Sequence, residues 1–155
     1  MHASRPDGGP ALFRLVRHWA RQWAPDVVQR FDEDAPPTWT VPNLFVIQAV
    51  AGAGPDEVTV ADVARQLGID RSVASRMITD AVRDGFVRRE TSSRDARRAA
   101  LQLTDEAGKF LHSAQTFQRQ AFDALVGHWP AADRTRFAGY LERLATEVLD
   151  SPEGS

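Results

Sequence analysis

The chain has 155 residues, 43% of them hydrophobic and 26% charged, and its formal net charge is −2. These values are typical of a globular protein with its own core and exclude a disordered chain. The absence of cysteine excludes disulfides, thiolate zinc sites and cysteine catalysis. The longest apolar run is too short for a membrane span and the first residues do not form a signal peptide, so a soluble cytoplasmic protein is expected.

Two helices are predicted in the N-terminal part of the chain. Residues 1–10 are rich in Pro, Gly and polar residues and are expected to form a flexible tail. In residues 11–41, apolar side chains recur at helical spacing from Ala11, Pro25 is expected to end or kink that helix, and a proline-rich loop follows. Pro42 suits the first turn of a second helix, and apolar residues on nearly all its sides predict that it is buried.

A helix-turn-helix is predicted in residues 59–84. Thr59 is a suitable N-cap for the first helix, and Gly68 is well placed to end it. After a two-residue joint, a second helix begins with Asp70 as its cap and stops at Gly85. Two short helices joined by so tight a turn are typical of this motif.

The second helix of the motif has two contrasting faces. One face is apolar and is expected to pack on the preceding helix. It consists of Val73, Ala74, Met77, Ile78 and Ala81. The opposite face consists of Ser72, Ser75, Arg76, Thr79 and Arg83. Arginine and hydroxyl groups at this spacing can contact base edges and phosphates in a DNA major groove, and the same face is also compatible with a solvated surface.

An arginine-rich hairpin is predicted after this helix. The segment 88–98, RRETSSRDARR, holds five arginines against two acids and lies between two stretches of β-prone residues. A ribbon directly after a helix-turn-helix is a wing, and arginines at its tip can enter a minor groove or neutralise phosphates. These tip residues are Arg94, Arg97 and Arg98. Asp95 is expected to pair with Arg97 or Arg71 and to hold the tip in shape.

Charge is unevenly distributed along the chain. Residues 59–104 contain nine arginines and six acids, a local charge of +3, which leaves −5 for the remaining residues. An anionic partner responds to the local field, so this asymmetry is more informative than the overall charge.

Two further helices are predicted in residues 105–150. Thr104 is a suitable cap for the first, and a break at residues 128–133 separates it from the second. The apolar stripes at residues 12–23 and 137–148 are wider than one small winged domain needs, and a monomer would leave them exposed. Homodimerisation through these terminal helices is therefore expected.

Taken together, these segments resemble the MarR family of winged-helix regulators. The resemblance is carried by VTVADVARQLGIDRSVASRMITDAVRDGFVRRE and DARRAALQLTDEAG, covers residues 44–104, and extends more loosely over the flanking helices. The family's Asp-x-Arg pair and the later Leu-Thr are here Asp95, Arg97, Leu103 and Thr104. The resemblance implies a mainly α fold with a small β-hairpin wing. In it, a winged helix-turn-helix domain at 42–104 is flanked by N-terminal and C-terminal dimerisation helices at 11–41 and 105–150.

The resemblance also implies a homodimer that binds a pseudo-palindromic operator in double-stranded DNA, usually as a repressor that a small and often aromatic ligand releases. The expected DNA contacts are Arg71, Ser72, Ser75, Arg76, Thr79, Arg94, Arg97 and Arg98. The family's ligand pocket lies between the dimer helices and the winged domain. Its candidate residues, each also explained by ordinary packing, are Arg17, His18, Trp19, Trp23, Trp39, Phe45, His112 and Phe117.

Other functions have less support in the sequence. None of the four histidines form a pair four residues apart, so no metal or cofactor is expected. No nucleophile with a base, no paired carboxylates and no phosphate loop are recognisable, so an enzyme is not expected. The alternative that remains is a winged-helix module that binds protein through its apolar helices without binding DNA.

Overall fold

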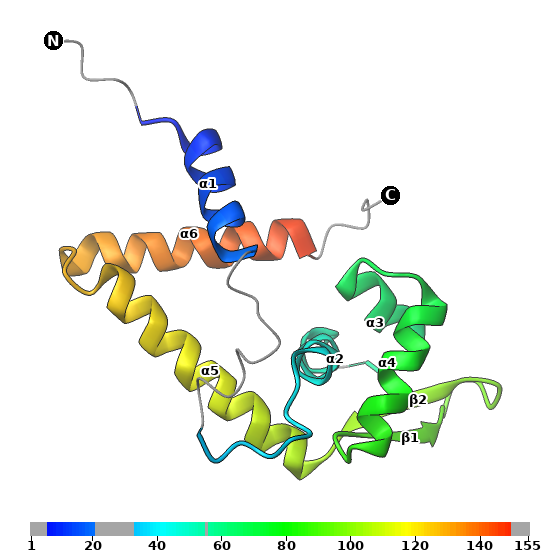
Figure 1. The fold of residues 1–155 in the computed structure, drawn as a ribbon. Coiled ribbons are helices and arrows are strands. Elements are labelled where there is room, and N and C mark those ends of the chain that lie inside the picture. The colour runs from blue at the N-terminus through cyan, green and yellow to red at the C-terminus, as the bar shows by residue number, and fades with distance from the viewer. Residues whose placement is uncertain (1–5, 21–32, 55, 150–155) are drawn as a thin grey trace, which may run out of the picture.

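The computed structural model of the chain describes residues 6–20, 33–54 and 56–149. Within these ranges it has six helices and one antiparallel hairpin. They are α1 (Gly8–Ala20), α2 (Val41–Gly52), α3 (Val60–Leu67), α4 (Arg71–Arg83), β1 (Val87–Thr91), β2 (Ala99–Leu103), α5 (Asp105–Val126) and α6 (Ala131–Leu149). Figure 1 shows α5 running from the α2–α4 region to α6, while the hairpin projects from the opposite end of the molecule. The mainly α fold with a hairpin wing is confirmed. No helix in the described ranges is long and apolar enough to cross a membrane.

The core is built around α2, which packs against α3, α4, β2 and α5. Leu44, Val46 and Ile47 of α2 are buried, so the prediction of a helix surrounded by other elements is confirmed. Phe110 of α5 is fully buried and stacks on Trp39, with ring centroids 4.5 Å apart. Stacked aromatic rings of this size contribute strongly to a core, and here they join the start of α5 to the loop before α2.

The helices of the helix-turn-helix begin and end where the sequence predicts, at an N-terminal capping box and at glycines in the left-handed conformation. The Thr59 hydroxyl accepts the N–H of Asp62, and the Asp62 carboxylate accepts the N–H of Thr59, which completes a capping box. Gly68 has φ 64° and Gly85 has φ 86°, a left-handed conformation that favours glycine. Asp70 is at the N-cap position of α4 as predicted, but its side chain makes no capping hydrogen bond.

The hairpin is fixed to the helix-turn-helix at its base. Val87 pairs with Leu103 in the antiparallel register, and the N–H of Leu101 donates to the carbonyl oxygen of Val58 at 2.8 Å. The hydroxyl of Thr104 donates to the carbonyl oxygen of Gly85 at 2.6 Å, and it also caps the first turn of α5. Thr104 therefore joins the end of α4, the end of β2 and the start of α5 at one point.

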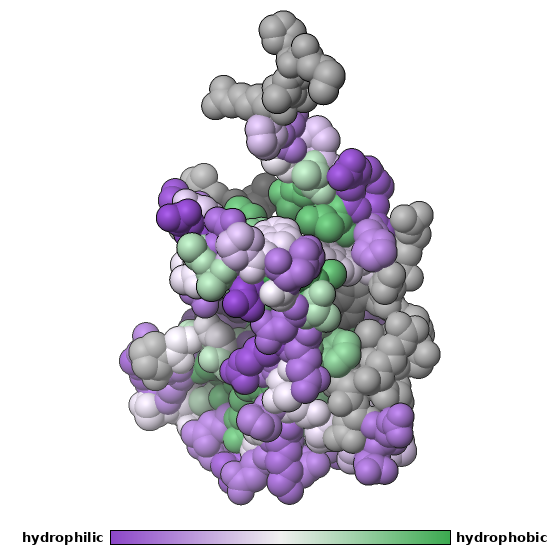
Figure 2. All heavy atoms as spheres, turned by 90° about the vertical axis from the view of Figure 1, so that its left-hand side faces the viewer, coloured by the Kyte–Doolittle hydropathy of each residue, from purple (hydrophilic) through white to green (hydrophobic). Residues whose placement is uncertain are grey.

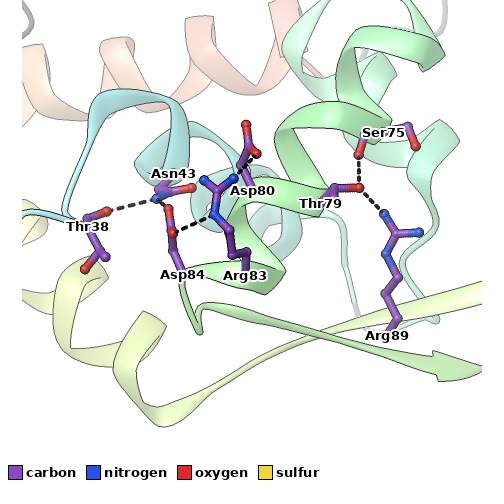
Figure 3. A network of polar contacts seen from close by, with 8 residues as sticks. All are labelled: Thr38, Asn43, Ser75, Thr79, Asp80, Arg83, Asp84 and Arg89. Carbon is purple, nitrogen blue, oxygen red and sulfur yellow. Dashed lines mark hydrogen bonds and ion pairs between the residues drawn. The ribbon is translucent and has the colours of Figure 1, made fainter.

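A buried amide fixes α4 against α2. Asn43 is 3% exposed, and its side-chain N–H groups donate to the carbonyl oxygen of Thr38 at 2.9 Å and to the carboxylate of Asp84 at 2.8 Å. Figure 3 shows Asp84 receiving a further hydrogen bond from Arg83, so the network continues to the C-terminal end of α4. Because buried polar groups without partners are costly, this network sets the position of α4.

The two terminal helices begin earlier than the sequence suggests. Helix α1 begins at Gly8 and not at Ala11, because the Asp7 carboxylate accepts the N–H of Gly9 and a proline is tolerated in the first turn. Helix α6 begins at Ala131, inside the predicted break. The expected kink at Pro25 lies outside the described residues.

Replacing Asn43 by alanine is expected to lower the free energy of unfolding by about 1–3 kcal/mol, because the Thr38 carbonyl and the Asp84 carboxylate lose their donor. Urea denaturation measures the change. Gln102→Ala, at an exposed position of β2, is the control and should stay within about 0.5 kcal/mol of the wild type. Equal stability of the two variants would contradict a structural role for the Asn43 amide.

Candidate nucleic-acid interface

The outer face of α4 is exposed as the helical spacing predicts. Ala74, Ile78 and Ala81 are fully buried, whereas Arg76 and Thr79 are exposed. Ser75 is only half-buried. The first turn of α4 has no side-chain cap, so its backbone N–H groups remain available to an anion.

Thr79 connects α4 to the wing. Its hydroxyl donates to the carbonyl oxygen of Ser75 at 2.9 Å and accepts a hydrogen bond from the guanidinium of Arg89 at 3.0 Å (Figure 3). Arg89 comes from β1 and was not among the expected contacts. Strand alternation could have found it, because Arg89 is two residues from the buried Val87 and so lies on the face of β1 that packs toward α4.

Positive charge on α4 is concentrated near its N-terminus. At the other end, Arg83 forms ion pairs with Asp80 at 2.9 Å and Asp84 at 3.3 Å. The hydrogen bond to Asp84, supported by the charge of Asp80, raises the pKa of Arg83. Arg83 is therefore compensated within the protein, whereas Arg71 and Arg76 have no ion-pair partner in the described part of the chain.

A carboxylate outside the wing anchors the wing. Glu57, in the segment before α3, accepts hydrogen bonds from the Ser92 hydroxyl, from the Ser93 hydroxyl at 2.6 Å and from the Ser93 N–H at 2.7 Å. The hydrogen bond from Ser92, followed by those from Ser93, lowers the pKa of Glu57 to about 2. The role of Glu57 is not predictable from the sequence, because Glu57 and Ser92 are separated by 35 positions and no local pattern links them.

Acids also organise the tip of the wing. Asp95 accepts the backbone N–H of Arg97 at 3.0 Å and lies 3.7 Å from the guanidinium of Arg98. Its expected shaping role is consistent with these bonds, but its ion-pair partner in the described chain is Arg98, and the expected side-chain pairing with Arg97 or Arg71 is not formed. Arg94 pairs with Asp56 at 3.0 Å. In the described chain, Arg88 and Arg97 are the wing arginines without an acidic partner or an internal hydrogen bond from the guanidinium.

The expected ligand-pocket residues fall into separate places. Trp39 is buried in the core, and its indole N–H has no hydrogen-bond partner among the described residues. Phe45 on α2 and Phe117 on α5 are half-buried, and His112 is exposed. The α1 candidates Arg17, His18 and Trp19 are all exposed, and Trp23 lies outside the described residues. The described residues contain no group of three or more side chains suited to bind a metal ion.

The fold and the arginine-bearing faces define a winged helix-turn-helix protein: α3 and α4 form the motif, and the β1–β2 hairpin is its wing. Residues 40–98, which contain α2, the helix-turn-helix and most of the wing, match the model of the MarR family. No curated protein sequence matches the chain.

Solved structures share the fold over nearly the whole chain. MepR, a transcription regulator of the Staphylococcus aureus multidrug efflux pump MepA, is 18% identical with a TM-score of 0.62, covering 92% of this chain and 99% of that one. A MarR/EmrR family transcriptional regulator from Acinetobacter sp. ADP1 is 14% identical with a TM-score of 0.61, covering 94% and 100%. A Staphylococcus aureus MepR–DNA complex is 18% identical with a TM-score of 0.57, covering 90% and 98%.

Replacing Glu57 by glutamine is expected to loosen the wing, because a neutral amide accepts hydrogen bonds from Ser92 and Ser93 less strongly than a carboxylate does. Hydrogen exchange of the Ser93 amide should become faster. Because folding lowers the Glu57 pKa, its contribution is complete above about pH 4.5 and is lost as pH falls toward about 2. Glu90→Gln, on exposed β1, is the control, and equal exchange rates in both variants would contradict the anchor.

Proposed function

We propose that this protein is a sequence-specific transcriptional regulator that binds double-stranded DNA as a homodimer at a pseudo-palindromic operator. The observation that carries this proposal is the arrangement of α4 and the wing. Helix α4 presents Arg71 and Arg76, and the hairpin beside it presents Arg97. None of these three arginines has an acidic partner in the described chain, and a DNA major groove is wide enough for one helix. The existence of a MepR–DNA complex with the same fold supports a duplex as the partner.

Electrostatics favour a polyanion at this surface. The segment 59–104 carries +3 in a chain of net charge −2. Phosphates would relieve the repulsion among these arginines and release condensed counterions. We therefore assign Arg71, Ser72, Ser75, Arg76 and Thr79 to the major groove side, and Arg94, Arg97 and Arg98 to the wing contacts.

The terminal helices supply the support for a homodimer. Neither α1 nor α6 contains a buried residue, although both are amphipathic. Their exposed large hydrophobic residues are Leu12, Phe13, Leu15, Val16, Trp19, Tyr140, Leu141, Leu144, Val148 and Leu149. Figure 2 shows hydrophobic surface in the upper part of the molecule, at the level of α1. A second copy would cover such a surface, and two-fold symmetry would place two α4 helices on successive turns of DNA.

We propose that the protein represses transcription and that a small ligand with a hydrogen-bond acceptor group releases it from DNA. Support comes from Trp39, which lies at the junction of α5 and the winged domain and whose buried indole N–H lacks a partner in the part of the chain that the structure describes. Buried indole N–H groups usually find an acceptor, and a carboxylate or phenolate would provide one. The proposed division is dimerisation segments at 11–41 and 105–150 and the DNA-binding domain at 42–104, and residues 8–10 of the expected tail 1–10 belong to helix α1 instead.

A footprint of the protein on the DNA upstream of its own gene tests the proposal directly. The protein is expected to protect two symmetric half-sites, and this protection should disappear when an aromatic acid is added. Charge reversal of Arg94, Arg97 and Arg98 should abolish it. Absence of binding at low salt would remove the proposal and would favour a winged-helix module that binds protein.

If Arg76 contacts a guanine, Arg76→Ala should weaken operator binding by about 1–3 kcal/mol and relax the preference at one base per half-site. Binding to a panel of single-base operator variants measures both effects. Arg119→Ala, which removes an exposed arginine of α5, is the charge-matched control. A loss of the same size on every sequence would assign Arg76 to a phosphate.

Leu144→Glu in α6 is expected to raise the dimer dissociation constant by roughly tenfold or more, because a carboxylate would be buried in the apolar interface. Sedimentation velocity measures the change. Leu144 is 44% exposed in the single chain, so the substitution should not disturb the fold of the chain. Thr146→Glu, also exposed and about 200° around the helix, adds the same charge as a control. Identical dissociation constants would argue against α6 as the interface.

A further inference from the structure

A cavity of about 320 Å³ lies where α3, α4 and the wing meet. It is lined by Thr59, Val60, Ala61, Arg71, Arg97, Arg98 and Ala99. The lining residues come from the start of α3, the start of α4 and the return of the wing onto β2. These three segments are distant in the sequence, so only the folded winged domain assembles the cavity.

Three arginines and no acidic residue line the cavity. Within the described residues, Arg71 and Arg97 have no acidic partner. Arg98 has only a long contact of 3.7 Å with Asp95. The acid closest in sequence to the α3 wall, Asp62, is engaged by the N–H and hydroxyl of Thr59 and by Arg65. The positive charge of the cavity is therefore largely uncompensated inside the protein.

Two backbone donors add to this charge. The capping box of α3 uses the N–H groups of Thr59 and Asp62, and Val63 donates to the carbonyl oxygen of Thr59. The N–H groups of Val60 and Ala61 are the remaining donors of this first turn, and both residues line the cavity. Guanidinium groups and backbone N–H groups are the donors that suit the oxygens of a phosphate, and the residues that carry both line this cavity.

We infer that this cavity binds a phosphate group, and that its occupant in the regulatory complex is one backbone phosphate of DNA. The inference rests on the proposed function and makes it more specific. Arg71 and Arg97 together hold one phosphate at the junction of the recognition helix and the wing, and Arg76 is left to contact bases. The cavity fixes the register of the protein on the duplex, because a phosphate contact carries position but not sequence.

Phosphate interference on operator DNA tests the inference. In a series of duplexes, each phosphate in turn is replaced by an uncharged methylphosphonate, and affinity is measured for the wild type, Arg71→Gln and Arg97→Gln. Replacement of the phosphate at one position per half-site should weaken wild-type binding roughly tenfold. The same replacement should have little effect on either variant, because the contact is already lost. The slope of the logarithm of the association constant against the logarithm of salt concentration should decrease in magnitude by about 0.9 for each phosphate contact that the variant loses.

Arg119→Gln is the matched control, since it removes an exposed arginine of α5 outside the cavity and should keep the wild-type interference pattern. Variants that retain full sensitivity at every phosphate, while their circular dichroism and melting temperature match the wild type, would overturn the inference and leave DNA binding intact.

Inorganic phosphate probes the same cavity without DNA. Titration should shift the amide resonances of Val60 and Ala61 in the wild type and in Arg119→Gln, but not in Arg71→Gln. If the protein binds no operator and these shifts still occur, the proposed function fails while the cavity remains a phosphate site. If neither the interference nor the shifts occur, the cavity inference fails as well.

Discussion

Five arginines within residues 88–98 repel one another, and the organisation of the winged domain follows from how the chain manages this repulsion. Two like charges 4 Å apart in water repel by about 1 kcal/mol. Asp56 compensates Arg94, Asp95 lies beside Arg98, and the ionised Glu57 holds the base of the loop through two serines. The compensation is incomplete in a specific place, because Arg97 has no acidic partner in the described chain and lines a cavity with Arg71. The remaining charge is thus positioned where an external anion can reach it.

Much of the fold could be predicted because its determinants are local. The capping box at Thr59, the left-handed glycines at Gly68 and Gly85, and the apolar face of α4 are set by residues within a few positions of one another. Local patterns do not reveal which distant residues meet. Glu57 anchors Ser92 across 35 positions, and the cavity combines the starts of α3 and α4 with the wing.

The aromatic residues show a different limit of sequence reasoning. A tryptophan with apolar neighbours is compatible with core packing and with a ligand pocket, and its spacing does not separate the two. The structure places Trp39 in the core against Phe110, and no described residue accepts a hydrogen bond from its indole N–H. Core packing and a ligand contact are therefore compatible at this residue. The position of Arg89 could be predicted in part: strand alternation indicates the face of β1 on which it lies, but not its hydrogen bond to Thr79.

Helix α5 connects the winged domain to the proposed dimer interface. It has 22 residues, which correspond to about 33 Å of helix. At its start, Thr104 is bonded to Gly85, so the direction of α5 is coupled to the end of the recognition helix. At its other end it joins α6, the helix whose apolar face we assign to the dimer interface. In such a dimer, a small tilt of α5 relative to α6 displaces the winged domain at the other end of α5. The distance between the two α4 helices then changes. A ligand beside Trp39 and Phe110 would act near the winged end of α5, where this tilt is set, and could alter the fit to DNA without touching the arginines.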